Sequence, residues 1–283
     1  MTLNGAAEML RQGGIENARQ EALVLFEMLL GLEPYRLMAE PDRDIQSDPL
    51  AEAVEKRASG YPLQYILGKW EFFGLELEVS EHCLCPRPDT EIAVERAIDL
   101  IPKNGSFLEL CTGSGCIPVS LCKTRGDVCG VATDLFDETV AVARRNAVRH
   151  GVDGRCRFVR ADLFCPDFFV CGEGKELVPP CGYDAIISNP PYIPTGDLES
   201  LSREVKHEPR AALDGGEDGL DFYRVIVRDY GRFLSAEGAM ILEIGYDQGE
   251  ALRRIAGENG YDCRIVKDLG GNDRVAELRR SIY

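Results

Sequence analysis

The chain has 283 residues, 45% of them hydrophobic and 28% charged, which suits a globular protein with one large domain and a small one. Its formal net charge of −16 argues against direct nucleic-acid binding, because following a phosphate backbone requires a basic face. No apolar run approaches the roughly 20 residues of a membrane span, and no secretory signal is visible at the start. We therefore expect a cytoplasmic protein with no membrane partner.

The chain contains eleven cysteines and three histidines, but no two cysteines form a Cys-x-x-Cys pair. Metal clusters and disulfide frameworks place their cysteines at characteristic spacings. Here the cysteines are scattered through apolar segments. We therefore expect reduced thiols and no metal site.

The first 68 residues predict a small helical domain, because apolar residues recur there at helical spacing. Such faces suit packing, and the domain is expected to recognise the substrate. Helices are expected over 2–12, from an Asn17 cap to Gly31, and from Ser47 or Asp48 to Gly60.

Residues 69–86 are expected to link this domain to a larger one over 87–283. Between Lys69 and Val79, aromatic and aliphatic residues alternate with acidic ones around a glycine, which predicts a β-hairpin. A proline-bounded segment then leads into a helix over Ile92–Leu100, which Asp89 or Thr90 can cap.

From residue 106 onward, short apolar strands alternate with helices, which predicts a doubly wound α/β sheet. Insertions at 165–181 and 194–219 follow strand ends, where such sheets bind ligands. Strands are expected over 106–110, 128–133, 155–161, 183–188, 240–244, 263–266 and 275–278, with helices over 117–123, 137–150 and 222–234.

Asn189-Pro190-Pro191-Tyr192 follows the strand 183–188 and is therefore expected at a carboxyl edge of the sheet. The prolines stiffen the segment and remove two backbone donors, while Asn189 adds a side-chain acceptor and Tyr192 a flat ring. This combination suits a planar –NH2 group: Asn189 and the Pro190 carbonyl accept its two hydrogens, and the ring covers one face. An ordinary strand-ending turn is the alternative.

Further residues at strand ends predict a nucleoside site beside this motif. The glycines of Thr112–Gly115 allow the backbone to approach a ligand closely. Asp134 is placed to accept hydrogen bonds from ribose hydroxyls, and Asp162 to bind an adenine amino group. S-adenosylmethionine fits, with its methyl group toward Asn189, whereas a dinucleotide is disfavoured because Pro118 occupies the position of a third glycine.

Between about Gly60 and Val275 the chain carries the motifs GYPLQYILGKWEFFGLELEV, CPRPDTE, ELCTGSGCI, NPPYIP, HEPRAALDGGEDGLDFYR, LEIGYDQG and DLGGNDRV. Together they resemble the HemK/PrmC family, the release factor glutamine methyltransferases. The resemblance implies a Rossmann-like, seven-stranded class I S-adenosylmethionine methyltransferase domain behind a small N-terminal helical domain. It also implies methylation of the side-chain amide nitrogen, N5, of the glutamine in the Gly-Gly-Gln motif of peptide chain release factors.

The resemblance and the strand-end pattern together give the expected site. Two departures from the family pattern stand out: Cys111 replaces the usual first glycine of the loop, and Cys85 replaces an aliphatic residue before a proline. Both replacements are small and apolar, so we expect cofactor binding to be retained. Catalysis is expected from Asn189, Pro190 and Tyr192, glutamine binding from Asn189, Pro190, Pro191 and Tyr192, and cofactor binding from Glu109, Cys111, Thr112, Gly113, Ser114, Gly115, Asp134, Asp162, Leu163 and Asn189.

Other function classes remain as alternatives. An adenine methyltransferase acting on DNA or RNA would use the same Asn-Pro-Pro-Tyr chemistry, but should carry a basic target-recognition region, which is not evident. A non-catalytic module that binds a translation factor would not need the amide site. An NAD oxidoreductase is the least favoured, because of Pro118.

Overall fold

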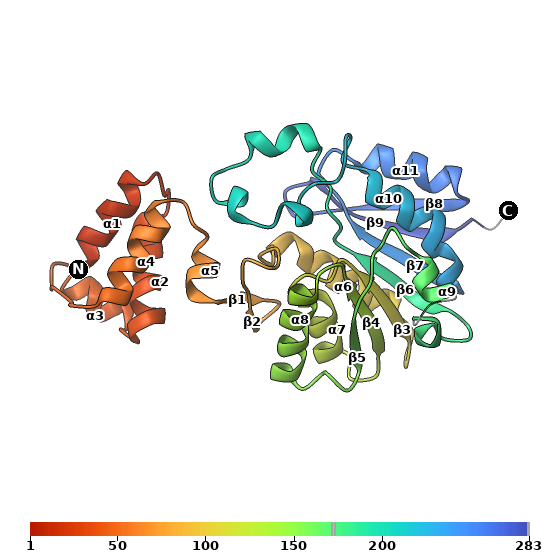
Figure 1. Cartoon of the computed structure of the whole chain (residues 1–283), viewed down its shortest axis with the longest axis horizontal. Coiled ribbons are helices and arrows are strands. Elements are labelled where there is room, and N and C mark those ends of the chain that lie inside the picture. The colour runs from red at the N-terminus through yellow and green to blue at the C-terminus, as the bar shows by residue number, and fades with distance from the viewer. Residues whose placement is uncertain (171, 173, 282–283) are drawn as a thin grey trace.

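Three parts follow one another along the chain in this computed structural model, which describes residues 1–170, 172 and 174–281 (Figure 1). The first part is helical and comprises α1 (Leu3–Gln12), α2 (Ala18–Leu30), α3 (Pro34–Ala39), α4 (Asp48–Ala58) and α5 (Leu63–Leu67). A two-stranded hairpin follows, formed by β1 (Lys69–Phe72) and β2 (Leu75–Glu78), as predicted. Over the described part of the chain, no helix is both long and apolar enough to cross a bilayer.

The third part is an α/β unit built on one seven-stranded sheet. Its strands are β3 (Ser106–Leu110), β4 (Cys129–Asp134), β5 (Cys156–Arg160), β6 (Tyr183–Ser188), β7 (Leu234–Glu243), β8 (Tyr261–Lys267) and β9 (Asp273–Arg280). Its α-helices are α6 (Glu91–Leu100), α7 (Cys116–Thr124), α8 (Asp137–His150), α9 (Asp167–Val170), α10 (Asp221–Val225) and α11 (Gly249–Glu258).

The strand order is β5-β4-β3-β6-β7-β9-β8, with β3 to β7 parallel and β9 antiparallel between β7 and β8. The chain runs from β3 outward to β5 on one side and then returns to β6 on the other. This reversal opens a crevice at the carboxyl ends of β3 and β6. The predicted Rossmann-like, seven-stranded fold with an N-terminal helical region is confirmed.

Alternation along the strands builds two hydrophobic cores, one on each face of the sheet. Phe107 and Ile187 belong to the core under α6, α7 and α8, which the hairpin extends. Their neighbours Leu108 and Ile186 belong to the opposite core, under α10 and α11. The apolar runs therefore read as strands buried on both faces, typical of a parallel sheet.

Helix caps agree only in part with the expectations. Ser47 caps α4 by accepting from the Leu50 amide at 3.3 Å, and Gly31 ends α2 in the left-handed conformation at φ 66°. The expected Asn17 cap is wrong: its side chain makes no capping bond, because its backbone (ψ 35°) lacks the extended conformation of a capping residue.

The expected Asp89 or Thr90 cap of the helix over 92–100 is also wrong. A single helical turn over Pro88–Thr90 runs directly into α6, so Thr90 already has helical backbone angles (φ −66°, ψ −20°). Its hydroxyl is instead free to contact the end of β6, where it accepts a hydrogen bond from Asn189.

The regular helix expected over 222–234 is another error. After α10, the chain widens into a π-type turn over Ile226–Tyr230 and tightens over Gly231–Phe233, and β7 begins at Leu234 rather than at 240. Residue 231 packs too closely for a side chain, because a Cβ on Gly231 would lie 1.8 Å from the Tyr261 hydroxyl oxygen. The first residues of β7 show no alternation of apolar and polar residues, so the sequence did not predict that the strand begins there.

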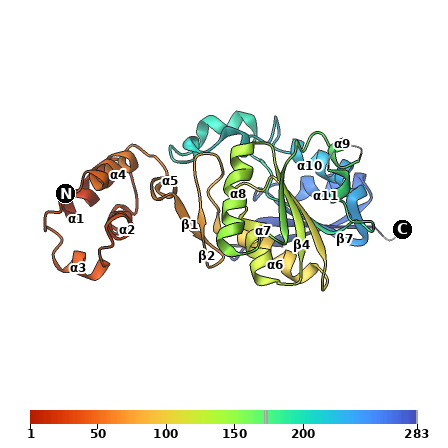
Figure 2. The same cartoon turned by 60° about the horizontal axis from the view of Figure 1, so that its bottom comes forward.

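The helical part forms a separate lobe beside the α/β unit, with the hairpin between them (Figures 1 and 2). The insertion over 194–219 joins the two lobes on one side. In the joint, buried Arg57 of α4 forms ion pairs with Glu21 of α2 and with Glu204 of the insertion, the latter at 2.9 Å. Arg203 also donates to the Ser59 carbonyl. Positions 171 and 173, in the other predicted insertion, lie outside the described residues.

Replacing Arg57 by alanine should lower the free energy of unfolding of the N-terminal lobe by roughly 3 kcal/mol, because it leaves two facing carboxylates unpaired. The neighbouring Lys56→Ala variant is a matched control. It removes only an exposed pair with Glu52 and should leave the free energy of unfolding nearly unchanged. Urea unfolding followed by fluorescence of Trp70, the one tryptophan, which packs on the lobe's core, measures both. Equal losses in the two variants would contradict the role assigned to Arg57.

Candidate active site

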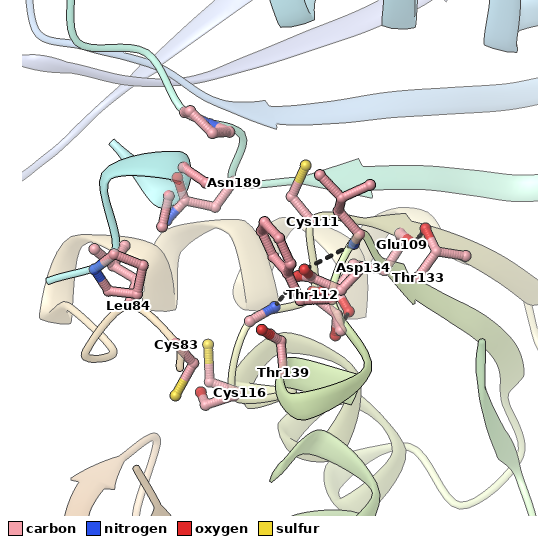
Figure 3. Close-up of a pocket in the computed structure, with 18 of the residues that line it drawn as sticks. Cys83, Leu84, Glu109, Cys111, Thr112, Cys116, Thr133, Asp134, Thr139 and Asn189 are labelled. Carbon is pink, nitrogen blue, oxygen red and sulfur yellow. Dashed lines mark hydrogen bonds between the residues drawn. The ribbon is translucent and has the colours of Figure 1, made fainter. Parts of the chain in front are cut away.

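A cavity of about 1030 Å³, its open mouth included, lies at the carboxyl ends of the central strands (Figure 3). The segments that follow β3, β4, β5 and β6 form one side of it. The other side consists of residues 82–87, which lead into α6, and of residues in the 194–219 insertion. The cavity thus occupies the crevice that the strand order creates.

The loop after β3 is built from unusual backbone conformations. Cys111, Gly113 and Gly115 all have positive φ, at 59°, 55° and 78°. A side chain on Gly115 would be strained, and its Cβ would lie 3.0 Å from that of Ala143. Gly115 therefore shapes the turn without lining the cavity, whereas Cys111 lines it despite the cost of a left-handed conformation.

Asp134 at the end of β4 holds this loop from the neighbouring strand. Its carboxylate accepts hydrogen bonds from the amides of Gly113 at 3.0 Å and Leu135 at 2.8 Å. Burial raises the pKa of Asp134, while these backbone donors oppose the rise. Each carboxylate oxygen keeps a free lone pair, so Asp134 can still accept from a ligand in the cavity.

Asp162, Leu163 and Phe164 line the cavity after β5. The Asp162 carboxylate accepts from the Phe164 amide at 2.9 Å, which forms a tight turn and holds the acid at the cavity wall. Leu163 is buried, and its carbonyl accepts from the Tyr230 hydroxyl at 3.0 Å. Apart from Gly115, the predicted cofactor residues after β3, β4 and β5 therefore come together around one cavity.

The Asn-Pro-Pro-Tyr motif lies at the end of β6, as predicted. Asn189 and Pro191 line the cavity, and the Asn189 side-chain nitrogen donates to the Thr90 hydroxyl at 3.2 Å. Pro190 is buried, and Tyr192 is half-buried against the core under α10 and α11. This burial raises the pKa of Tyr192 to about 12. The roles expected for Pro190 and Tyr192 stay predictions.

The wall opposite the strand ends joins two motifs that lie far apart in sequence. Glu208 of the insertion is 4% exposed, forms an ion pair with Arg87 and accepts from the Cys85 amide at 3.2 Å. Burial raises the pKa of Glu208, and the adjacent guanidinium opposes the rise. Pro209, next in the chain, lines the cavity, so this ion pair shapes the side from which a substrate would enter.

The carboxylates of the cavity give it an acidic character. Asp134 and Asp162 line it, against Arg87 as the one lysine or arginine among its described lining residues, whereas burial favours the neutral form of Glu109. Glu109 is fully buried, and its carboxylate accepts from the Thr112 hydroxyl. Such a cavity favours a ligand that carries positive charge.

Three polar residues of this region escaped the sequence analysis as site residues: Thr90, Glu208 and Glu243. Thr90 read as a local helix cap, and Glu208 lay in an insertion without periodicity. Glu243, at the end of β7, is 2% exposed. The sequence pattern that could have identified Glu243 is a single acidic residue within the apolar run Met240–Ile244.

Glu109→Gln should raise the free energy of unfolding above that of the wild type, and this gain should be larger at high pH than at low pH. Burial raises the pKa of Glu109 well above its ordinary value, so the folded state keeps its proton to a higher pH than the unfolded chain. Unfolded chains then bind fewer protons than folded ones, and wild-type stability falls as pH rises through this window. The variant's advantage should grow in urea unfolding from about pH 5 to about pH 8. If the difference in free energy of unfolding between variant and wild type did not change with pH, Glu109 would not be neutral in the folded protein.

Comparisons with known proteins agree with this geometry. Residues 2–68 match the model of the PrmC N-terminal domain family. A release factor glutamine methyltransferase of Geobacter sulfurreducens is 41% identical, over 94% of this chain and 91% of that protein. A second release factor glutamine methyltransferase, from Agrobacterium fabrum, is 36% identical over 98% of this chain and 96% of that protein.

Solved structures share the fold at lower identity. The hMettl16 catalytic domain, crystallised with a MAT2A 3′UTR hairpin, aligns with a TM-score of 0.58 at 17% identity, over 84% of this chain and 82% of that one. A methyltransferase from Pyrococcus furiosus aligns with a TM-score of 0.52 at 20% identity, over 73% and 89%. These likenesses show the fold alone, whereas the curated relatives match nearly the whole chain. The protein belongs to the family of release factor glutamine methyltransferases.

Proposed function

We propose that the protein transfers a methyl group from S-adenosylmethionine to N5 of the glutamine in the Gly-Gly-Gln motif of peptide chain release factors. The observation that carries the proposal is that Asn189 and Asp134 line one cavity from two strands of the same sheet. An amide-binding residue and a nucleoside-binding residue thereby share one reaction space. Family membership supports the same chemistry.

The residues of the cavity fit S-adenosylmethionine, which supplies an electrophilic methyl group on a sulfonium. Asp134 accepts from the ribose hydroxyls, and Asp162 accepts from the adenine amino group. Leu163 and the exposed rings of Phe136 and Phe164 offer apolar surface to the base. The acidic lining matches the positive charge of the sulfonium and ammonium groups.

Asn189 is the proposed centre of acceptor binding. An amide nitrogen is a poor nucleophile, because its lone pair is delocalised into the carbonyl. If the Asn189 side-chain oxygen and the Pro190 carbonyl accept its two hydrogens, positive charge that builds on nitrogen is stabilised where it develops. The proton becomes acidic only after attack, so alignment rather than a strong base does most of the work.

We propose that residues 1–68 recognise the release factor, that 69–86 link the domains and that 87–283 carry the methyltransferase chemistry. The insertion over 194–219 supports this division, because it contacts the helical lobe through Glu204 and the cavity wall through Glu208. A bound protein that touches the helical lobe is thus close to the cavity. Because the substrate is a translation factor, we place the enzyme in the cytoplasm.

A nucleic-acid adenine is the competing acceptor for an Asn-Pro-Pro-Tyr site. A glutamine on a flexible Gly-Gly-Gln loop enters a narrow cavity without the few kcal/mol needed to unstack a base. The formal net charge of −16 also removes the usual source of affinity for phosphates. Protein is therefore the favoured substrate, and direct nucleic-acid binding is not part of the proposal.

Incubation with labelled S-adenosylmethionine should add one methyl group to a release factor, at the glutamine of its Gly-Gly-Gln motif. A release factor with that glutamine replaced by alanine is the matched control and should stay unlabelled. Duplex DNA should stay unlabelled at low and high salt. Mass spectrometry of both acceptors decides the substrate, and methyladenine in DNA or a methyl group elsewhere on the release factor would overturn the assignment.

Asn189→Ala and Asp134→Ala should separate catalysis from cofactor binding. Asn189→Ala should lower turnover on the order of 100-fold, the usual scale for one positioned transition-state partner, with little loss of cofactor affinity. Asp134→Ala should weaken S-adenosylmethionine by roughly 1.5–3 kcal/mol, as expected for hydrogen bonds to a charged group. Turnover assays and calorimetry measure the two effects. Wild-type turnover in the first variant, or unchanged affinity in the second, would contradict the assigned role.

A further inference from the structure

Glu243 is a buried acid with no partner for part of its carboxylate. It is 2% exposed, and its Oε2 accepts no hydrogen bond from the residues that the structure describes. An unsatisfied buried polar atom costs roughly 1–3 kcal/mol, and so calls for a specific reason. Glu243 is not among the residues that line the cavity, so direct contact with a ligand does not supply that reason.

Strand register brings Glu243 level with Asn189. Ser188 of β6 pairs with Leu242 of β7 in a parallel ladder, so Asn189, which follows β6, and Glu243, the last residue of β7, lie side by side. Thr90 lies at the same place, since its hydroxyl accepts the Asn189 side-chain hydrogen at 3.2 Å. Against the effect of its burial, hydrogen bonding with the side chains of Thr90 and of Asn189 lowers the pKa of Glu243.

The direction of these hydrogen bonds follows from the donors available. In its bond with Asn189 the Thr90 hydroxyl is the acceptor, so its own hydrogen is left to donate elsewhere. The ionised Glu243 carboxylate beside it can only accept. Thr90 can therefore accept from the Asn189 amide and donate to the Glu243 carboxylate, while Asn189 also acts on the same carboxylate directly.

We propose that Glu243 is a positioning residue that acts together with Thr90 to fix the Asn189 amide with its oxygen toward the acceptor. This inference rests on the proposed function and deepens it. An Asn189 turned the other way would present its –NH2 group to the –NH2 group of the substrate, donor against donor. Holding the nitrogen on Thr90 leaves the oxygen to take the substrate hydrogen.

Groups that face Glu243 from neighbouring elements agree with an acceptor that ionises near neutrality. Asp89 and Arg274 act on it from either side, but Arg274 already pairs with Asp89 at 3.2 Å and with Asp268 at 3.0 Å. Tyr192, Tyr223 and Cys116 also face it. Burial raises the pKa of Glu243 to about 7. Its protonation at lower pH supplies a competing donor to Thr90 and loosens the orientation of Asn189.

Kinetics of Glu243→Gln and Thr90→Val on a release factor test the proposal. Each variant should lower kcat roughly 10- to 100-fold, because a misplaced catalytic group costs that much, with unchanged calorimetric affinity for S-adenosylmethionine. Thr90→Ser keeps the hydroxyl and should restore turnover. The double variant Thr90→Val/Glu243→Gln should lose less activity than the product of the two single losses, since both variants release the same Asn189 amide. Glu277→Gln, which changes a buried acid of the adjacent strand β9, is the matched control and should retain activity.

Multiplicative losses in the double variant, or full activity of Glu243→Gln, would overturn the role of Glu243. A wild-type enzyme that leaves the release factor unmethylated would overturn the proposed function instead.

NMR separates the two failures, because it needs no substrate. In ¹⁵N-labelled wild-type protein, the Asn189 side-chain amide signals, assigned by their absence in Asn189→Ala, should shift with pH with a midpoint near that of Glu243. In Glu243→Gln this shift should vanish. Signals that do not titrate in the wild type, or that titrate equally in Glu243→Gln, would refute the coupling whatever the substrate is.

Discussion

Parallel pairing of the central strands is the constraint on which the cavity depends. Leu110 of β3 pairs with Thr133 of β4 and with Ser188 of β6, and Ser188 pairs with Leu242 of β7. The next residue of each strand lies at the same level: Cys111 and Asn189 follow their strands, while Asp134 and Glu243 are the last residues of theirs. Backbone hydrogen bonds between the strands thus align the proposed cofactor residues, the proposed acceptor residue and the buried acid in one row.

The insertion over 194–219 gives the crevice its second wall and connects it to the helical lobe. Arg57 and Glu204 tie one end to that lobe, while Glu208 ties the other end to Arg87, which precedes α6. Each glutamate binds its guanidinium group through one oxygen. The insertion therefore connects the helical lobe to the cavity wall through a short stretch of chain.

Apolar periodicity was enough to predict the sheet, because a parallel strand buried on both faces reads as a continuous hydrophobic run. It was not enough for the segment 221–233, where the helix widens over Ile226–Tyr230 and tightens over Gly231–Phe233. The rule that ligands bind at the carboxyl ends of parallel strands identified Asp134, Asp162 and Asn189 as candidates. Asp134 ends β4, Asn189 follows β6, and Asp162 lies two residues after β5. It missed Thr90, because a threonine before a helix has an ordinary local role as a cap, and its actual partner is distant in sequence.

Four cysteines among the cavity's lining residues, Cys83, Cys85, Cys111 and Cys116, have a consequence for selectivity. A sulfonium methyl donor is an alkylating agent, and a thiolate is a far better nucleophile than an amide. Burial raises the pKa of Cys83 to about 11 and raises those of the other three thiols as well. Thiols with raised pKa values favour the protonated, weakly nucleophilic form, so in the proposed reaction they compete poorly with the substrate amide for the methyl group.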